Sequence, residues 1–163
     1  YCACVTIRRT TAMRVTLHTD YALRVLMLLA AEPDELHTIE EVSVRYGISR
    51  NHLMKVAQTL VQGGFVEGVR GRSGGLRLGM SPESINLGTV VRKTEDGFNL
   101  VECFDHNINT CVISEVCGLR GPLEEALAAF LSVLDSYSLA DLLKNPGKMR
   151  RMRRILDPEN RAL

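Results

Sequence analysis

Residues 38–64 read TIEEVSVRYGISRNHLMKVAQTLVQGG, and this stretch decides the fold. Thr38, followed by Glu41 three residues later, gives a capping-box pattern that predicts the start of a short helix. Gly47 supplies the C-terminal stop of that helix, and Ser49 is placed to be the N-cap of the next one. Two helices joined by so short a turn are typical of a helix-turn-helix, in which the second helix enters the major groove of DNA.

Apolar residues recur at helical spacing in both helices and in a helix before them. The positions are Ile39, Val42 and Tyr46; Leu53, Val56, Ala57 and Leu60; and, in the preceding helix, Ala22, Val25, Leu26 and Leu29. We expect the preceding helix to run from an N-cap at Thr19 to about Ala31, and a further helix to cover residues 87–94. Residues 65–69 and 76–79 resemble two strands joined by the turn GRSGG. The pattern predicts a mainly α fold with a small β-hairpin wing, a winged helix-turn-helix followed by a long dimerisation helix.

Basic residues gather in the segment from residue 45 to residue 77, although the whole chain is balanced, with 20 basic against 19 acidic residues. The segment holds one acid, Glu67, and the basic residues Arg45, Arg50, Lys55, Arg70, Arg72 and Arg77. Such a local excess predicts binding to DNA phosphates, whereas the alternative is an ordinary solvated helix face and hairpin turn. The candidate DNA-binding residues are Ser49, Arg50, Asn51, His52, Lys55, Arg70, Arg72 and Ser73.

Three cysteines lie close together in the run CFDHNINTCVISEVC, at positions 103, 111 and 117. Soft thiolate ligands favour zinc or an iron–sulfur cluster, so Cys103, Cys111 and Cys117 are candidate metal ligands. The chain shows neither a signal-peptide pattern nor an apolar run long enough to span a membrane, which predicts a cytoplasmic protein. In that reducing compartment, clustered cysteines indicate metal or redox chemistry more than disulfides.

After the cysteine loop, apolar residues recur at spacings of 4, 3, 4 and 3 residues. They are Leu123, Leu127, Phe130, Leu134 and Tyr137. Such a seam is suited to packing against a partner helix, and it predicts a homodimer that binds a palindromic DNA operator. Half-site centres would lie about 34 Å apart, or a multiple of it. Alternatively, the seam packs on the winged domain of its own chain.

These patterns divide the chain into five segments. They are residues 1–12, an upstream extension expected to be disordered, with Cys2 and Cys4 exposed; 13–96, the winged helix-turn-helix domain; 97–118, the cluster-binding cysteine loop; 119–145, the dimerisation helix and the short helix SLADLL; and 146–163, a basic tail expected to be frayed.

Residues 13–144 resemble a known family in five stretches: DYALRVLMLLA, YGISRNHLMKV, VRGRSGGLRLG, the cysteine loop and SLADLL. Together they are similar to the NsrR repressors, the nitric-oxide-responsive branch of a bacterial family of winged-helix iron–sulfur regulators that also includes IscR. The resemblance implies a homodimeric transcriptional repressor that senses nitric oxide and releases nitrosative-stress genes. It also implies that each subunit holds an iron–sulfur cluster through the three loop cysteines.

The resemblance further implies a fourth ligand, a carboxylate donated by the partner subunit. Asp20 stands at the matching position, although an acid in the first turn of a helix is also favoured by the helix dipole. His106 and His18 are the other candidates. Arg120 stands three residues after Cys117, where IscR-like proteins carry a histidine ligand, which favours a 4Fe–4S over a 2Fe–2S cluster. The seven-residue gap before Cys111 is longer than is usual in the family.

Other functions remain open at this point. The same DNA-binding domain could carry a zinc site formed by three cysteines and Asp20, or a cluster that senses iron supply or redox state. An iron–sulfur enzyme is the alternative from another class. The sequence argues against it, because GRSGG lies in a hairpin rather than between a strand and a helix, and the four histidines suggest no nucleophile–base pair. We therefore expect a regulator and not an enzyme.

Overall fold

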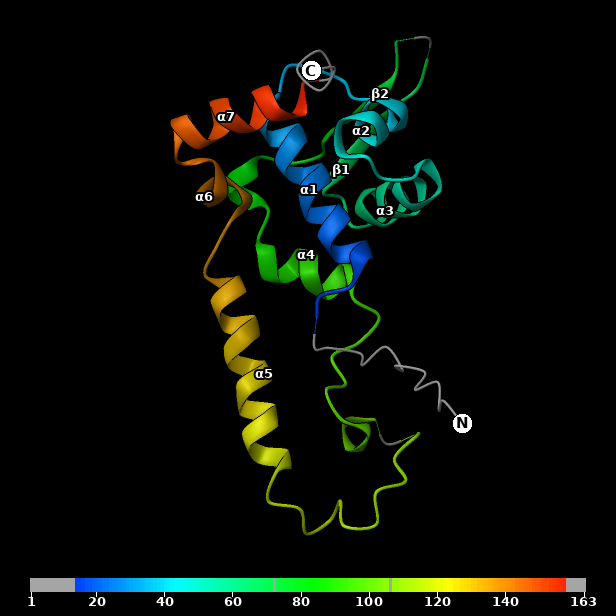
Figure 1. Ribbon diagram of the computed structural model, residues 1–163, viewed down its shortest axis with the longest axis vertical. Helices are drawn as coiled ribbons and strands as arrows, with labels where there is room; N and C mark the ends of the chain where they lie inside the picture. The colour runs from blue at the N-terminus through cyan, green and yellow to red at the C-terminus, as the bar shows by residue number, and fades with distance from the viewer. Residues whose placement is uncertain (1–13, 72, 106, 158–163) are drawn as a thin grey trace, which may run out of the picture.

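The computed structural model describes residues 14–71, 73–105 and 107–157, so the expectations for residues 1–12, Arg72 and His106 lie outside the described residues. The helices are α1 (Leu17–Ala31), α2 (Ile39–Tyr46), α3 (Arg50–Gln62), α4 (Leu87–Thr94), α5 (Arg120–Asp135), α6 (Leu139–Leu143) and α7 (Pro146–Leu156). Two strands, β1 (Val66–Val69) and β2 (Gly75–Leu78), pair antiparallel, and short 3-10 helices cover Pro82–Ser84 and Glu102–Phe104. The mainly helical fold with a two-stranded wing is confirmed (Figure 1).

The hydrophobic core forms around α1, which packs against α3, α4, α6 and β2. Because neighbours surround α1 on several sides, most of its length is apolar, and Leu26, Leu28 and Leu29 are fully buried. The expected apolar faces of α1 and α3 are buried in this core, as is Val42 of α2. Ile39 and Tyr46 are half-buried and pack against it.

The helix-turn-helix forms as its capping residues predict. Thr38 Oγ1 accepts a hydrogen bond from Glu41 N at 3.1 Å, and Thr38 N donates to Glu41 Oε2 at 2.7 Å, so the capping box is present. Gly47 ends α2 with a φ of 66°, in the left-handed region that glycine adopts without steric cost. Ser49 Oγ then caps α3 by accepting from His52 N.

The wing is joined to the loop between α1 and α2. His37 N donates to Leu76 O at 3.1 Å and Leu76 N donates to His37 O at 2.8 Å, which forms an isolated bridge beside β2. Gly75 permits this approach, since a Cβ there would come within 3.0 Å of the His37 backbone. The α1–α2 loop therefore supports one edge of the hairpin.

The structure corrects the expected start of α1. The N-cap is Thr16 and not Thr19: Thr16 Oγ1 accepts from Thr19 N at 3.3 Å, and Thr19 lies buried inside the helix. Thr16 is fixed from elsewhere in the chain, because its backbone N–H and its hydroxyl both donate to Glu95 Oε1, just after α4. A tertiary contact thus selects between two threonines that the sequence alone does not separate.

The expected frayed tail is also wrong over residues 146–156, which form helix α7. Asn145 caps this helix by accepting from Lys148 N at 3.0 Å. Leu156 is buried and Met152 packs against the core, so two apolar side chains hold an otherwise basic helix in place. The basic composition concealed this apolar face.

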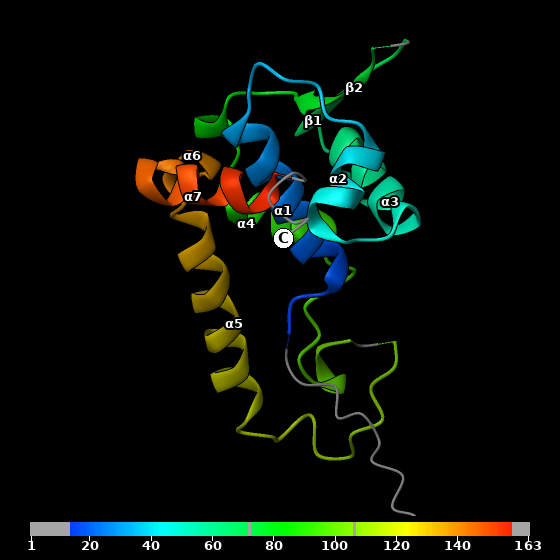
Figure 2. The ribbon, with the colours of Figure 1, turned by 45° about the horizontal axis from the view of Figure 1, so that its top comes forward.

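We call residues 16–95 together with 138–157 the head, and residues 97–137, which comprise the cysteine loop and α5, the arm. Helix α5 meets the head at its C-terminal end, where Arg92 Nη2 donates to Asp135 Oδ2 at 2.7 Å and Asn86 Nδ2 donates to Asp135 O at 2.6 Å. From there the arm extends away from the head, and both views place the cysteine loop and the wing at opposite ends (Figures 1 and 2). Within the described residues we find no helix that could cross a lipid bilayer.

Candidate functional site

The first turn of α3 presents the polar residues expected of a recognition helix. Asn51 and His52 are exposed, Lys55 is exposed one turn further on, and Ser49 is exposed just ahead of the helix. Arg50 is exposed as well, but its Nη1 lies 2.8 Å from Glu40 Oε2 on α2. Since this ion pair is on the surface, it costs little to break, and Arg50 stays available to a stronger anionic partner.

The basic segment carries less free charge than its sequence suggests. Arg45 Nη1 lies 2.6 Å from Glu32 Oε2, and Arg77 Nη2 lies 3.0 Å from Glu67 Oε2. Counting charges only between residues 45 and 77 missed Glu32 and Glu40, which pair with Arg45 and Arg50 from outside the segment. Within the described part of the chain, Lys55 on α3 has no acid at ion-pair distance, and neither has Arg70 at the wing tip.

The wing tip holds the remaining candidates. Arg70 and Ser73 are exposed on either side of the turn, and Gly71 has a φ of 125°, which favours glycine. The tip therefore projects basic and small polar side chains away from the core.

A small hollow of about 180 Å³ lies beside the recognition helix. The rings of Tyr21 and His52 are 6.1 Å apart at its wall. His18, a candidate fourth metal ligand, lies here as well, and its Nε2 is 3.1 Å from Thr59 Oγ1 on α3. His18 is thus engaged within the head.

The three loop cysteines have free thiols. Cys103 is buried in the short 3-10 helix, and Cys111 and Cys117 are half-buried. Polar residues shape the loop through local hydrogen bonds: Cys111 N donates to Asn109 Oδ1 at 3.1 Å, and Asn107 N donates to Asp105 Oδ1 at 2.9 Å. The structure brings the cysteines into one loop, but their three sulfurs do not all lie within 4.8 Å of one another.

Apolar side chains stand out from this loop into solvent. Val112 is 97% exposed and Val116 is 84% exposed, and Ile108 and Ile113 of the loop and Leu119 just after it are more than half exposed. Clustered exposed apolar residues of this kind mark a surface that another molecule covers. The sequence analysis missed them because it searched the loop only for ligands.

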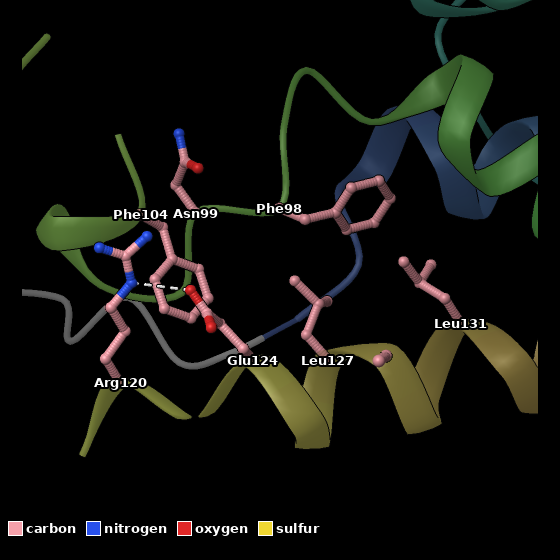
Figure 3. Close-up of a pocket in the computed structure, with 8 residues that line it drawn as sticks. Phe98, Asn99, Phe104, Arg120, Glu124, Leu127 and Leu131 are labelled. Atoms are coloured by element: carbon pink, nitrogen blue, oxygen red, sulfur yellow. Dashed lines mark hydrogen bonds and ion pairs between the residues drawn. The ribbon is translucent and has the colours of Figure 1, made fainter. Parts of the chain in front are cut away.

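An open hollow of about 370 Å³ separates the loop from α5 (Figure 3). Phe98 and Phe104 reach into it from the loop side, while Leu127 and Leu131 reach into it from α5. At its polar end Arg120 Nε donates to Glu124 Oε1 at 2.7 Å.

Arg120 also links this hollow to the cysteine loop. The hydrogen bond to Glu124 raises the pKa of Arg120 above its ordinary value, and the charge of Cys103 adds to that effect. A fixed cation therefore stands near one of the three thiols.

Helix α5 leaves its apolar seam uncovered. None of its residues, all of which the structure describes, is buried. Leu123, Leu127 and Leu134 are half-buried, whereas Phe130 is 41% exposed and Tyr137, just beyond the helix, 47% exposed. Val133 is more exposed still, and the heptad count passed over it. The head packs on this helix chiefly through α4, and the hydrogen bonds of Asp135 place that contact at the C-terminal end.

Asp20 is engaged within its own helix. Its Oδ2 lies 2.6 Å from Arg24 Nη2 and its Oδ1 accepts from Arg24 Nε at 3.1 Å. This two-point contact i to i+4 is the ordinary arrangement for an acid near the start of a helix. A ligand role for Asp20 would require Arg24 to give up at least one of these contacts.

Comparison with known proteins places the chain among regulators of transcription. A family model, Rrf2, described as an iron-dependent transcriptional regulator, matches residues 15–145. The chain belongs to the Rrf2 family. The match covers the winged domain, the cysteine loop and α5, so it includes both the head and the arm.

Curated Rrf2 relatives include regulators named NsrR. The chain is 63% identical to the HTH-type transcriptional regulator NsrR of Bacillus subtilis strain 168 over 134 residues, which cover 82% of this chain and 92% of the relative. It is 50% identical to the NsrR of Bacillus licheniformis over 141 residues, which cover 86% of this chain and 99% of the relative. The resemblance drawn from the sequence is thereby confirmed.

Solved structures agree on the fold. IscR from T. potens has a TM-score of 0.65 at 24% identity, covering 82% of this chain and 88% of its own. CymR, the global cysteine regulator of B. subtilis, has a TM-score of 0.62 at 23% identity, covering 82% of this chain and 98% of its own. As an Rrf2 protein, the chain is a DNA-binding regulator of transcription and not an enzyme.

Proposed function

We propose that this Rrf2 protein is a homodimeric repressor that holds an iron–sulfur cluster through Cys103, Cys111 and Cys117 and leaves its operator in response to nitric oxide. The observation that carries the proposal is the combination of a self-contained DNA-binding head with an arm that gathers three free thiols in one loop and leaves apolar side chains uncovered. The similarity to regulators named NsrR, and the iron dependence in the family description, support the same function.

The donor set of the loop fits an iron–sulfur cluster. Three free thiols on one loop supply the soft ligands that such clusters require. When bound, a cluster supplies iron to which nitric oxide can bind. Arg120, in place of a histidine, supports the 4Fe–4S form, and Asp20 of the partner subunit remains the proposed fourth ligand.

A single zinc ion would need the three sulfurs closer together than they lie in the loop. Thiolates bound to one tetrahedral zinc at about 2.3 Å lie roughly 3.8 Å apart. Because the three sulfurs do not all lie within 4.8 Å, the loop would have to contract to hold zinc.

We assign DNA binding to the exposed polar residues of α3 and of the wing. Asn51 and Arg50 are chemically suited to read adenine and guanine edges, while Lys55 and Arg70 suit the phosphate backbone. We assign Ser49, His52 and Ser73 to DNA binding as well, and Arg72, which lies outside the described residues, stays a candidate from the sequence. Two such faces on a dimer would read a palindromic operator with half-site centres about 34 Å apart.

We assign the dimer contact to the seam of α5 that the head leaves uncovered: Leu123, Leu127, Phe130, Leu134 and Tyr137. Through α5, a change in the loop can reach the head, because Asp135 joins α5 to Arg92 and Asn86 of α4. Gly88 makes this junction possible, since any Cβ there would clash with Asp135. The cysteine loop, α5 and this junction form the proposed route from signal to recognition helices.

The test uses protein purified without oxygen and an operator selected from random DNA. We expect the unsubstituted chain to bind the selected site tightly and to lose at least ~10³-fold in affinity after nitric oxide, the usual gap to non-specific binding. Cys111→Ala should show that loss without nitric oxide and remain folded. Ser114→Ala, in the same loop, is the matched control and should behave as the unsubstituted chain. Tight, nitric-oxide-sensitive binding by Cys111→Ala would refute the proposal.

Iron supply is a second candidate signal, which the family description as iron-dependent favours. The two signals separate in the same assay. If chelating iron releases the operator while nitric oxide does not, the cysteine loop senses iron supply.

A further inference from the structure

A second group of potential ligands lies in the head, far along the chain from the cysteines. Glu32, Glu35 and His37 place one ligand atom each within 4.8 Å of one another, in the loop between α1 and α2. Among the described residues no other set of three histidine, cysteine or acidic side chains comes this close. The proposed function uses none of these residues.

His37 is the unusual member of the group. Its side chain is only 2% exposed, and its Nε2 is buried with no hydrogen-bond partner in the described part of the chain. That nitrogen points at the acids, since it lies 3.3 Å from Glu32 Oε2, yet the geometry is not that of a hydrogen bond. A buried polar nitrogen without a hydrogen-bond partner costs free energy. We therefore expect a bound partner at this nitrogen.

We propose that Glu32, Glu35 and His37 form a binding site for a divalent transition-metal ion of the zinc type. One imidazole and two carboxylates are the donor set that such ions accept. Ligands at about 2.0–2.1 Å from a tetrahedral zinc lie roughly 3.3 Å apart. The separation of His37 Nε2 from Glu32 Oε2 is 3.3 Å, so two ligands already stand at this spacing.

Arg45 tunes this site. Its Nη1 donates to Glu32 Oε2 at 2.6 Å and so holds that carboxylate in position, as hydrogen-bonded partners of ligand carboxylates do elsewhere. Its positive charge also opposes a bound cation. Binding should therefore be weaker than in a closed structural zinc site and should respond to metal concentration.

The site lies directly behind the wing. The backbone of His37 exchanges two hydrogen bonds with Leu76 of β2, so an ion that fixes His37 also fixes one edge of the hairpin. The consequence is a metal-dependent stiffening of the element that carries Arg70 to DNA, independent of the cysteine loop.

The test is zinc titration by calorimetry on the full chain with all five cysteines replaced by serine, so that no thiol competes. We expect one Zn²⁺ ion per chain. Glu35→Gln should weaken binding at least tenfold, and His37→Gln should abolish it. Asp34→Asn is the matched control, because it removes an equal charge from the same loop and should change affinity less than twofold.

Absence of zinc binding, or equal weakening by Glu35→Gln and Asp34→Asn, would overturn the site, since either leaves only general attraction to acids. Should the cysteine-free chain fail to fold, cobalt absorbance of the unsubstituted chain decides the same question. Cobalt absorption bands that show no sulfur-to-metal charge transfer and vanish in Glu35→Gln support the site. A spectrum in which all cobalt is bound through sulfur refutes it. Hydrogen exchange at the Leu76 amide should slow with zinc, and an unchanged rate would refute the link to the wing.

Discussion

The head and the arm of this Rrf2 protein differ in how much apolar surface each covers by itself. In the head, leucines from α1, α3 and α6 are fully buried in one continuous core. In the arm, Cys103 is the one described residue that is buried, and Val112 and Val116 of the loop stand almost wholly in solvent. The head therefore folds around its own core, whereas the arm leaves apolar surface uncovered. We propose that a second subunit and a cluster complete the arm.

The contrast is also one of connection. The head is held by contacts between elements far apart in the chain, such as Thr16 with Glu95 and His37 with Leu76. The cysteine loop is held mainly by hydrogen bonds between close sequence neighbours, as between Asn109 and Cys111. Local contacts of this kind set no unique loop shape, and such regions are well suited to change state when a ligand binds or leaves.

The largest expected effect tests the self-sufficiency of the head. Leu60→Ala removes a fully buried side chain from α3 and should lower the free energy of unfolding by about 2–5 kcal/mol. Met54→Ala, on the exposed side of the same helix, should change it by no more than about 0.5 kcal/mol. Urea denaturation measures both. Equal effects would mean that the head has no core of its own.

The next effect tests whether the arm needs a second subunit. Phe130→Glu places a charge in the uncovered seam and should weaken dimerisation at least ~100-fold, as expected for a large aromatic at the centre of an interface. Ser132→Glu puts the same charge on another side of α5 and serves as the control. Sedimentation velocity reports the outcome. A Phe130→Glu protein that stays dimeric would remove α5 from the interface.

A smaller effect separates paired from unpaired basic residues on the head. Lys55→Ala should weaken DNA binding and lower the slope of log affinity against log salt by about one, as for a phosphate contact. Arg77→Ala should change the slope less, because Glu67 accepts from both Nε and Nη2 of Arg77 and Arg77 is not among the residues that we assign to DNA binding. Binding measured at several salt concentrations tests this, and equal slopes for the two variants would contradict it.

The smallest effect lies at the junction of head and arm. The hydrogen bond from Arg92 holds the pKa of Asp135 below its ordinary value of 3.8. A lowered folded-state pKa stabilises the fold above the unfolded value, and this stabilisation is lost as the pH falls through the folded value. Arg92→Gln should therefore raise the pKa of Asp135, measured by NMR titration. The free energy of unfolding of Arg92→Gln should differ from that of the unsubstituted chain only at pH values above the range in which Asp135 titrates.

Much of the head could be predicted from the sequence because its signals are local. The capping box at Thr38, the stop at Gly47 and the cap at Ser49 each act within a few residues, and all three are confirmed. The predicted N-cap of α1 was wrong because Glu95, distant in sequence, selects Thr16. Helix α7 was missed since two apolar side chains among many basic ones give little periodic signal.

The arm was less predictable in the same physical terms. The cysteines and the seam are visible as residue types, but the cluster and the second subunit that we propose for them lie outside this chain's own contacts. In the head, the acids that pair with Arg45 and Arg50 were missed because charges were counted within one segment only. The group around His37 follows no recognisable sequence spacing. Only the structure reveals it, through the buried His37 nitrogen that has no hydrogen-bond partner.

Native mass spectrometry of the chain purified without oxygen tests the central claim most directly. If the arm is completed by a partner and a cluster, the spectrum will show a dimer carrying iron and sulfide equivalent to one cluster per subunit, and Cys111→Ala will show none. A monomer, or a dimer that carries zinc or no metal after the same handling, would contradict that claim.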